Sequence, residues 1–296
     1  MARYPEKSFG LPLTRSRMLR KFLNMLLGMV VVSVLLFGGL VVFAKYVTRT
    51  LPWQHPVLDT QRPPDPDSVG AKGVLIFSKT NGFRHESIEA GVEALKREGQ
   101  KRGWDVRTTE NGAFFNDDYL QRFKVVVFLS TTGDVLTEEQ ERSLEFFVET
   151  GGGYAGIHAA ADTEADWPWY HRMLGAHFRD HTLFPRHTPW AEVVTETRDH
   201  PATRHLPPRW RKRDEWYNFT RSVRGLDSAR VLLRVNDSSY TARFPKPMGP
   251  DHPISWTNVQ GDGRVFYTAL GHASETFAEP FTLRHMVEGI AWAGRF

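Results

Sequence analysis

The sequence predicts an α/β domain with an open, mostly parallel sheet covered by helices on both faces, preceded by one N-terminal transmembrane helix. Two observations predict this class. Short apolar runs alternate with segments of helical periodicity from residue 73 to residue 157, and one long apolar run lies within the first 50 residues. Strands that alternate with helices at this spacing form βαβ units, which build a parallel sheet.

The long apolar run, Phe22–Phe43, contains one asparagine and one serine and is otherwise apolar. A helix of 22 residues reaches roughly 33 Å, enough to cross a hydrocarbon core of about 30 Å. A cleaved secretory signal has a shorter apolar run and a small-x-small cleavage site. Val42 and Ala44 do not form such a site, so the sequence predicts an uncleaved anchor over residues 22–44.

The basic residues are concentrated around this run. Residues 1–50 hold eight Lys or Arg and one acid, a net charge of +7 in a chain whose total is +4, which leaves the remainder at −3. Six of the eight precede the run, so the positive-inside rule predicts a cytoplasmic basic segment at 1–21. The chain is then a single-pass protein of the cytoplasmic membrane with its C-terminal domain outside, in the periplasm or the extracellular space. The mildly acidic remainder lacks the basic surface of a nucleic-acid-binding protein.

Residues 45–72 carry five prolines and show neither helical nor strand periodicity. They predict a stiff, extended linker between the anchor and a domain at 73–296. The chain has no cysteine, which excludes disulfides, thiolate metal sites and a cysteine nucleophile.

The expected elements of the domain follow from apolar periodicity. A helix is expected from Ser87, a second one capped by Thr137 with Gln140 in the capping-box position, and a third in the closing segment from Pro280. Gly261-Asp262-Gly263 predicts a hairpin turn. Strands are expected at residues 73–78, 104–109, 125–129, 153–157, 190–196, 216–219, 231–235, 254–257 and 264–269.

Polar residues follow several of these strands. In an open parallel sheet, ligands bind beyond the carboxyl ends of the strands. That rule selects the loop with His85, the Thr131–Gly133 turn, His158 and His272. We therefore expect these four segments to meet at one edge of the sheet.

His158 lies in the segment G-G-G-Y-A-G-I-H-A-A-A at 151–161. The small residues around it are typical of a sharp strand-to-helix turn, as in the nucleophile elbow of hydrolases. A histidine there is suited to act as a general base or a metal ligand. The alternative is a Gly/Ala-rich turn whose histidine bonds backbone groups.

Six segments occur in order along the chain: N-G-F-R-H-E-S at 81–87, G-G-G-Y-A-G-I-H-A-A at 151–160, H-F-R-D-H at 177–181, D-E-W-Y at 214–217, I-S-W-T at 254–257 and G-R-V-F-Y-T-A-L-G-H at 263–272. Together they resemble the ThuA-like family, named for trehalose utilisation, whose fold is that of class I glutamine amidotransferases and is flavodoxin-like. Class I amidotransferases carry a cysteine at the elbow. His158 stands there in this chain, so glutaminase activity is excluded.

The resemblance implies a role in carbohydrate metabolism, with a small carbohydrate as ligand. Imidazoles and carboxylates in one cleft suit proton abstraction beside a sugar carbonyl, or a divalent metal such as zinc that polarises one. The expected catalytic residues are His158, His272 and Glu215, the expected substrate-binding residues are His85, Asp214, Tyr217 and Trp256, and the expected metal ligands are His158, His181 and His272.

Structural roles remain open for several of these residues. His181 could lie in a solvated loop, His85 could cap the helix beside it, and Trp256 could belong to the core. Two functions follow from the sequence: an enzyme acting on a sugar or keto-sugar by acid/base or metal-assisted chemistry, and a non-catalytic module that binds carbohydrate at the membrane surface.

Overall fold

The structure is a computed structural model that describes residues 13–48, 55–64 and 68–296. Residues 1–12 of the expected basic segment, and residues 49–54 and 65–67 of the expected linker, lie outside this description. The chain divides into two units, Met1–Gln54 and His55–Phe296.

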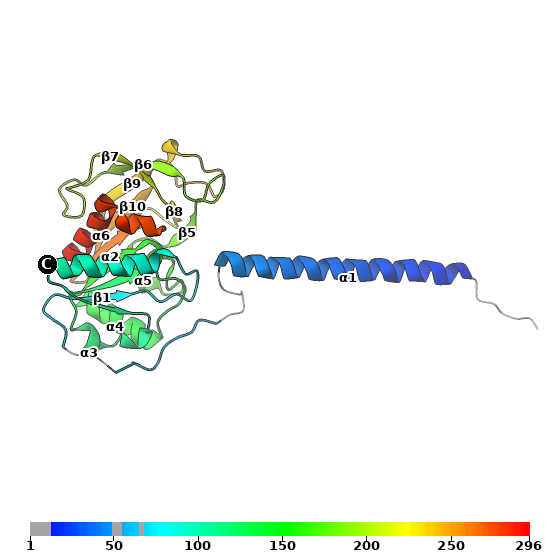
Figure 1. The fold of residues 1–296 in the computed structure, drawn as a ribbon, viewed down its shortest axis with the longest axis horizontal. Coiled ribbons are helices and arrows are strands. Elements are labelled where there is room, and N and C mark those ends of the chain that lie inside the picture. The colour runs from blue at the N-terminus through cyan, green and yellow to red at the C-terminus, as the bar shows by residue number, and fades with distance from the viewer. Residues whose placement is uncertain (1–12, 49–54, 65–67) are drawn as a thin grey trace, which may run out of the picture. The chain divides into compact units, whose positions relative to one another are not determined.

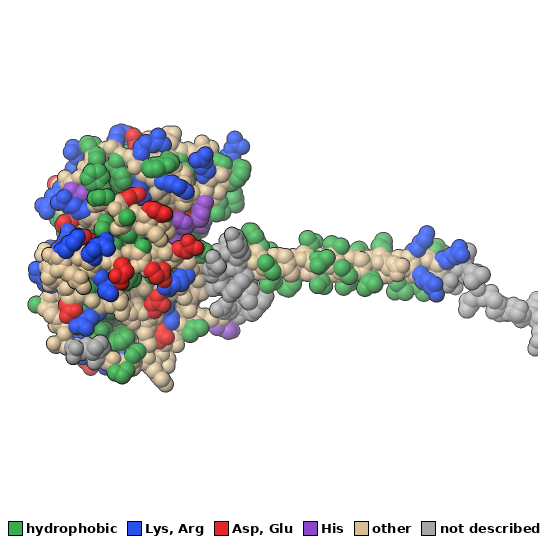
Figure 2. Space-filling view, in the orientation of Figure 1, with side chains coloured by type: hydrophobic (Ala, Val, Ile, Leu, Met, Phe, Trp, Pro, Cys, Tyr) green, Lys and Arg blue, Asp and Glu red, His purple; other side chains and the backbone are tan. Residues whose placement is uncertain are grey.

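The described part of the first unit is the helix α1 (Leu13–Thr48), within which Arg17–Phe43 is long and apolar enough to cross a membrane. Hydrophobic side chains cover this helix on all the sides visible in Figure 2, and Lys or Arg side chains lie at its N-terminal end. By length and composition it is a candidate membrane span, and a signal sequence near the N-terminus has the same properties.

The second unit is built on one sheet with the strand order β2-β1-β3-β4-β11-β10-β9-β6-β7 (Figure 1). Half of the sheet is parallel and has the order 2-1-3-4 of flavodoxin-like folds, with β11 as the fifth parallel strand. Its strands are β1 (Gly73–Phe77), β2 (Asp105–Thr109), β3 (Val125–Leu129), β4 (Gly153–Ile157) and β11 (Gly263–Thr268).

The other half of the sheet is antiparallel. It comprises β10 (Pro253–Gln260), β9 (Arg230–Asn236), β6 (Trp190–Thr195) and β7 (Arg209–Arg213). The α/β class is confirmed. The sheet is mixed, because the strand pairs from β2 to β11 are parallel, as expected, and those beyond β11 are antiparallel. The sequence predicted neither β7 nor β5 (Phe178–His181), which pairs with β8 (Tyr217–Phe219) in a separate two-stranded sheet.

Helices cover both faces, as neighbouring residues of β3 show. Leu129 contacts α2 (Ser87–Lys101), because a Cβ built on Gly91 of that helix would lie 3.1 Å from the Leu129 side chain. Phe128 points to the opposite face, where its ring lies 5.9 Å from that of Tyr170 in α5 (Pro168–Leu174). The remaining helices are α3 (Asp117–Leu120), α4 (Glu138–Glu149) with the expected capping box at Thr137, and α6 (Pro280–Ala293).

Part of the expected linker is bonded to the domain. The Asp59 carboxylate lies 2.6 Å from the Lys79 ammonium and accepts a hydrogen bond from the Gly112 backbone N–H. The Asp59 carbonyl accepts one from Gln140, and the backbone of Val57 bonds the Asn81 side chain. This part of the chain therefore belongs to the domain and does not lie free as a spacer would.

We expect Asp59→Asn to destabilise the His55–Phe296 unit by about 1–3 kcal/mol, because it leaves the largely buried Lys79 ammonium without a charged partner. Urea denaturation measures this loss. Asp118→Asn is the matched control, since Asp118 is exposed and bonds no buried cation among the described residues. Equal stability of the two variants would contradict a role for Asp59 in holding this segment.

Candidate metal centre

Four side chains from separate segments meet beyond the carboxyl ends of the parallel strands. His85 lies in the loop after β1, His158 directly follows β4, His272 follows β11, and Glu215 lies between β7 and β8. Each offers one nitrogen or oxygen, and these atoms all lie within 4.8 Å of one another. Histidine side chains also reach the surface over β5 and β8 (Figure 2).

Glu215 lies at the middle of this group. Its Oε2 atom is 3.1 Å from His272 Nδ1, 3.3 Å from His158 Nε2 and 3.9 Å from His85 Nε2. The two Nε2 atoms of His85 and His158 are 3.1 Å apart. A tetrahedral zinc ion with bonds of about 2.0–2.1 Å sets its ligand atoms about 3.3–3.4 Å apart, close to these separations.

The backbone around His158 presents its ring to the group. His158 has φ +53°, a left-handed conformation that is rare for a residue with a side chain. Small neighbours leave room for this turn, because a Cβ at Gly156 would lie 3.2 Å from that of Ala160 and one at Gly271 would lie 3.1 Å from that of His158. The turn is sharp, as the sequence predicted, and a short 3-10 helix, His158–Asp162, follows it.

A hydrogen bond fixes which ring nitrogen of His158 carries the proton. Nδ1 lies 2.7 Å from the Ala269 carbonyl and donates to it, so in the neutral ring the lone pair is on Nε2. That nitrogen faces His85 and Glu215, and also the Tyr217 hydroxyl at 3.3 Å. This bond between Nδ1 and a carbonyl is the arrangement that orients metal-bound histidines.

Asp214 holds the backbone of the centre. Its carboxylate accepts hydrogen bonds from the backbone N–H groups of Glu215, Gly271 and His272. Its side chain is buried, 3.7 Å from the Lys212 ammonium. Asp214 was expected to bind substrate, and its bonds instead join the segments that carry Glu215 and His272.

The second oxygen of Glu215 faces two further histidines. Oε1 lies 3.1 Å from His181 Nδ1 and is hydrogen-bonded to His187 Nε2. His181 Nδ1 is also 3.0 Å from the Thr182 carbonyl, so this nitrogen carries a proton and donates. His181 and His187 are therefore placed to orient the carboxylate from outside, although with Glu215 they form a second group whose atoms could hold an ion.

The charge states of two residues suit cation binding. Burial and the nearby His158 lower the pKa of His85 to about 3, so its ring is neutral at pH 7. Burial alone would raise the pKa of Glu215, but the close approach of four histidines holds that pKa well below its ordinary value. The group thus offers a carboxylate together with a neutral imidazole at neutral pH.

Among the described residues, three buried atoms of the centre have no hydrogen-bond partner: His85 Nδ1, Glu215 Oε2 and His272 Nδ1. Glu215 Oε2 and His272 Nδ1 face each other at 3.1 Å without the geometry of a hydrogen bond. A buried polar atom without a partner carries a free-energy cost of about 1–3 kcal/mol. A shared cation would satisfy both atoms, so the residues fit a divalent metal such as zinc.

A carboxyl group that the sequence did not single out lies nearby. Burial and the negative charge of Glu215 raise the pKa of Asp162 to about 7. Asp162 ends the short 3-10 helix that begins at His158, four residues before it. His187 was missed as well, because it lies in an irregular loop where no periodicity or strand end marks it.

Trp256 does not lie at the centre. The sequence expected it to bind substrate, but its side chain is fully buried and its indole N–H donates to the Leu174 carbonyl at 2.7 Å. Its ring packs against Phe219 and Tyr267. Trp256 is a core residue because β10, which carries it, is covered by α5.

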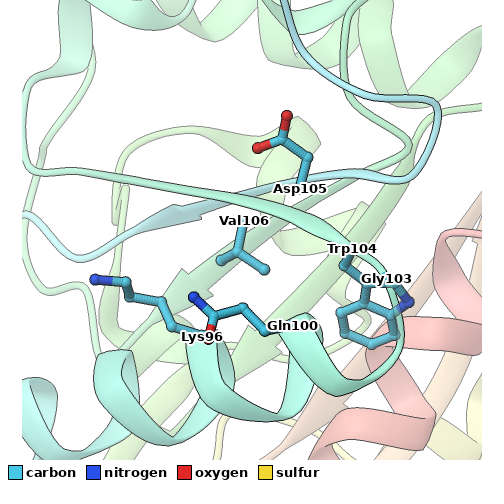
Figure 3. A pocket seen from close by; sticks show the side chains of 6 residues that line it. All are labelled: Lys96, Gln100, Gly103, Trp104, Asp105 and Val106. Carbon is cyan, nitrogen blue, oxygen red and sulfur yellow. The ribbon is translucent and has the colours of Figure 1, made fainter.

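A cavity of about 410 Å³ lies elsewhere, between α2 and β2 (Figure 3). Lys96 and Gln100 line it from the last turns of the helix, and Asp105 lies at the start of the strand. The helix begins beside His85 and runs away from it, so this cavity is at the amino ends of the strands. It does not belong to the histidine group.

The fold and the centre define a class: a flavodoxin-like α/β domain with a histidine–carboxylate group at the carboxyl edge of its sheet and a histidine in place of an elbow cysteine. The family model for ThuA, described as trehalose utilisation, matches residues 73–293. The chain belongs to the ThuA family.

Solved structures agree with this assignment. A ThuA-like protein from Bacteroides uniformis has a TM-score of 0.63 at 22% identity, covering 79% of this chain and 95% of its own. A ThuA-like protein from Parabacteroides merdae has a TM-score of 0.61 at 20% identity, covering 75% and 90%. At these identities the likeness shows the fold alone. No curated protein matches the chain.

Proposed function

We propose that this chain is a metal-dependent enzyme of carbohydrate utilisation that acts on a sugar or keto-sugar. The observation that carries the proposal is the convergence of His85, His158, His272 and Glu215 with ligand-like spacing. A divalent cation held by these residues supplies a Lewis acid for a carbonyl or hydroxyl oxygen. The family description, trehalose utilisation, supports a sugar as the substrate.

The other residues of the centre then hold and move protons. Tyr217 keeps its phenolic proton, because burial and the charge of Glu215 raise its pKa well above the ordinary value. Its hydroxyl can therefore donate a hydrogen bond. The Asp162 carboxyl, with a pKa near neutrality, is suited to exchange a proton with substrate.

The second candidate is a non-catalytic binding module, and one observation favours it. Four protein ligands fill a tetrahedral shell, as in structural zinc sites, whereas catalytic zinc keeps one position open. His158 and Glu215 are buried, and His272 is the most exposed of the four at 19% of its side chain. An enzyme would need the ion to accept a fifth ligand or Glu215 to move.

Cobalt substitution tests both candidates. We expect the full chain, purified in detergent and dialysed against a chelator, to take up one Co²⁺. A d–d absorption spectrum that changes on adding a keto-sugar shows an accessible ion and supports the enzyme. A tetrahedral spectrum that no sugar alters, with sugar binding that survives metal removal, supports the module. Failure to take up metal contradicts the metal-dependent proposal.

For the location, we propose a single-pass cytoplasmic membrane protein with a cytoplasmic N-terminus and an extracytoplasmic domain. The charge asymmetry around α1 supports this orientation. Reporters active on only one side of the membrane, fused after Phe296, test it. A signal from the cytoplasmic reporter alone contradicts the orientation, and a chain shortened by more than about 40 residues contradicts the anchor.

A further inference from the structure

A second cavity carries an excess of positive charge and lies at the same edge of the sheet as the metal centre, because β9 runs in the same direction as β11. Its volume is about 750 Å³, and it is lined by the end of β9 and the loop over residues 240–250. Its lining includes one carboxylate, Asp237, and three cations, Arg234, Arg243 and Lys246.

Two of these cations have no acidic partner. Within the residues that the structure describes, Arg243 and Lys246 form no ion pair, whereas Arg234 lies 2.9 Å from Glu196. Asp237 forms an ion pair with neither of them, and its carboxylate accepts hydrogen bonds from the Tyr240 hydroxyl, the Gly249 backbone and the His252 ring. The cavity therefore presents two unpaired cations.

The same bonds to Asp237 hold the wall of the cavity in place. Gly249 donates to it at 2.7 Å and has φ +93°, a conformation that disfavours other residues. His252, fully buried, connects it to the protein interior. The loop is thus fixed before any ligand arrives, which lowers the entropy cost of binding.

Two connections join this cavity to the metal centre. His252 Nε2 bonds the backbone carbonyl of Tyr217, whose hydroxyl faces His158. Backbone hydrogen bonds between Phe184 and Phe244 tie the loop that carries His187 to the loop that lines the cavity. The loop that lines the cavity is therefore bonded to elements that position the centre.

We propose that this cavity is a subsite for an anionic group, a carboxylate or a phosphate, on the saccharide that reaches the metal centre. The substrate class is then an acidic saccharide, a uronate or a sugar phosphate. Arginine and lysine form charge-assisted hydrogen bonds with both anions. That the ligand is a saccharide rests on the proposed function, whereas its negative charge is inferred from the cavity alone.

Calorimetric titration of the zinc-loaded full chain in detergent tests the subsite, with glucuronate, glucose 6-phosphate, inorganic phosphate and glucose as probes. We expect at least one charged sugar to bind about tenfold or more tightly than glucose, an advantage that weakens as salt rises. Tighter binding of glucuronate identifies a carboxylate, and tighter binding of glucose 6-phosphate together with phosphate identifies a phosphate.

The variant Arg243→Gln with Lys246→Gln should lose this preference, so that charged sugars bind no more tightly than glucose. Lys96→Gln, in the cavity of Figure 3, is the matched control and should change neither. Equal binding of charged and neutral sugars, or a preference that survives the double variant, overturns the subsite. If the chain takes up no metal but still binds charged sugars more tightly than glucose, the subsite stands and the metal-dependent function fails.

Discussion

Replacing Glu215 with Gln is expected to lower zinc affinity by more than about 100-fold. Removing a residue that only hydrogen-bonds a metal ligand costs up to about 100-fold, and loss of a ligand itself should cost more. The amide keeps the shape of the side chain but removes the negative charge that three histidines face at 3.1–3.9 Å. The single carbonyl oxygen of Gln can still accept the bond from His187, but the NH2 group then faces the three histidines. Competition with a chromophoric chelator measures the affinity.

Glu93→Gln is the control for this variant, since Glu93 is an exposed residue of α2 and should leave zinc affinity unchanged. The metal-free forms of Glu215→Gln and of the unaltered chain should both unfold cooperatively, which separates loss of a ligand from loss of the fold. Zinc affinity that stays within about threefold of the unaltered chain would remove Glu215 from the ligand set, because a ligand carboxylate contributes far more.

The second large effect concerns acid stability and His285, a fully buried residue of α6 remote from the metal ligands. Burial lowers the pKa of His285 to about 3. The hydrogen bond to the Ala202 carbonyl opposes this shift but is the smaller effect. The ordinary pKa of 6.5 applies in the unfolded chain. Between these values the unfolded chain binds a proton that the folded chain does not. Stability therefore falls as the pH falls below 6.5, by about 1.4 kcal/mol per pH unit.

Gln in place of His285 cannot bind this proton in the unfolded chain. As the pH falls from 6 to 4.5, the free energy of unfolding should therefore fall less steeply, by about 1.4 kcal/mol per pH unit. Gln can bond both the Ala202 carbonyl and Ser255, the partners of the ring. Urea denaturation at several pH values measures the slope. Arg284→Gln, on the exposed side of the same helix, should shift the curve without changing its slope. Parallel curves for His285→Gln and the unaltered chain would show that His285 takes up a proton in the folded state.

The parts of the fold that the sequence predicted are those with one dominant physical signal. β1, β3 and β4 are uninterrupted apolar runs because helices cover both of their faces. β7 escaped prediction because its sequence R-W-R-K-R is typical of a charged edge strand, in which only Lys212 is buried. β5 has four residues and pairs outside the main sheet, so its alternation is too short to recognise.

The candidate site divides in the same way. The rule that ligands bind at the carboxyl ends of strands was enough to select His85, His158 and His272, which the structure brings together. Glu215 came only from the family resemblance, since it lies on a connection between strands that this rule does not reach. Whether these residues catalyse, or bind a metal, remains a prediction.

The separation of the four central side chains along the chain has a consequence for the lifetime of the protein. No two of them are nearer than 57 residues in the sequence, so an unfolded chain cannot gather them at one ion without closing long loops. An ion would then bind the folded chain almost exclusively and stabilise it by about 4 kcal/mol at a free concentration 1,000 times Kd. We expect the cellular abundance of this protein to follow the supply of its cation. In metal-starved cells its level should fall because the destabilised chain is degraded faster, before its synthesis falls.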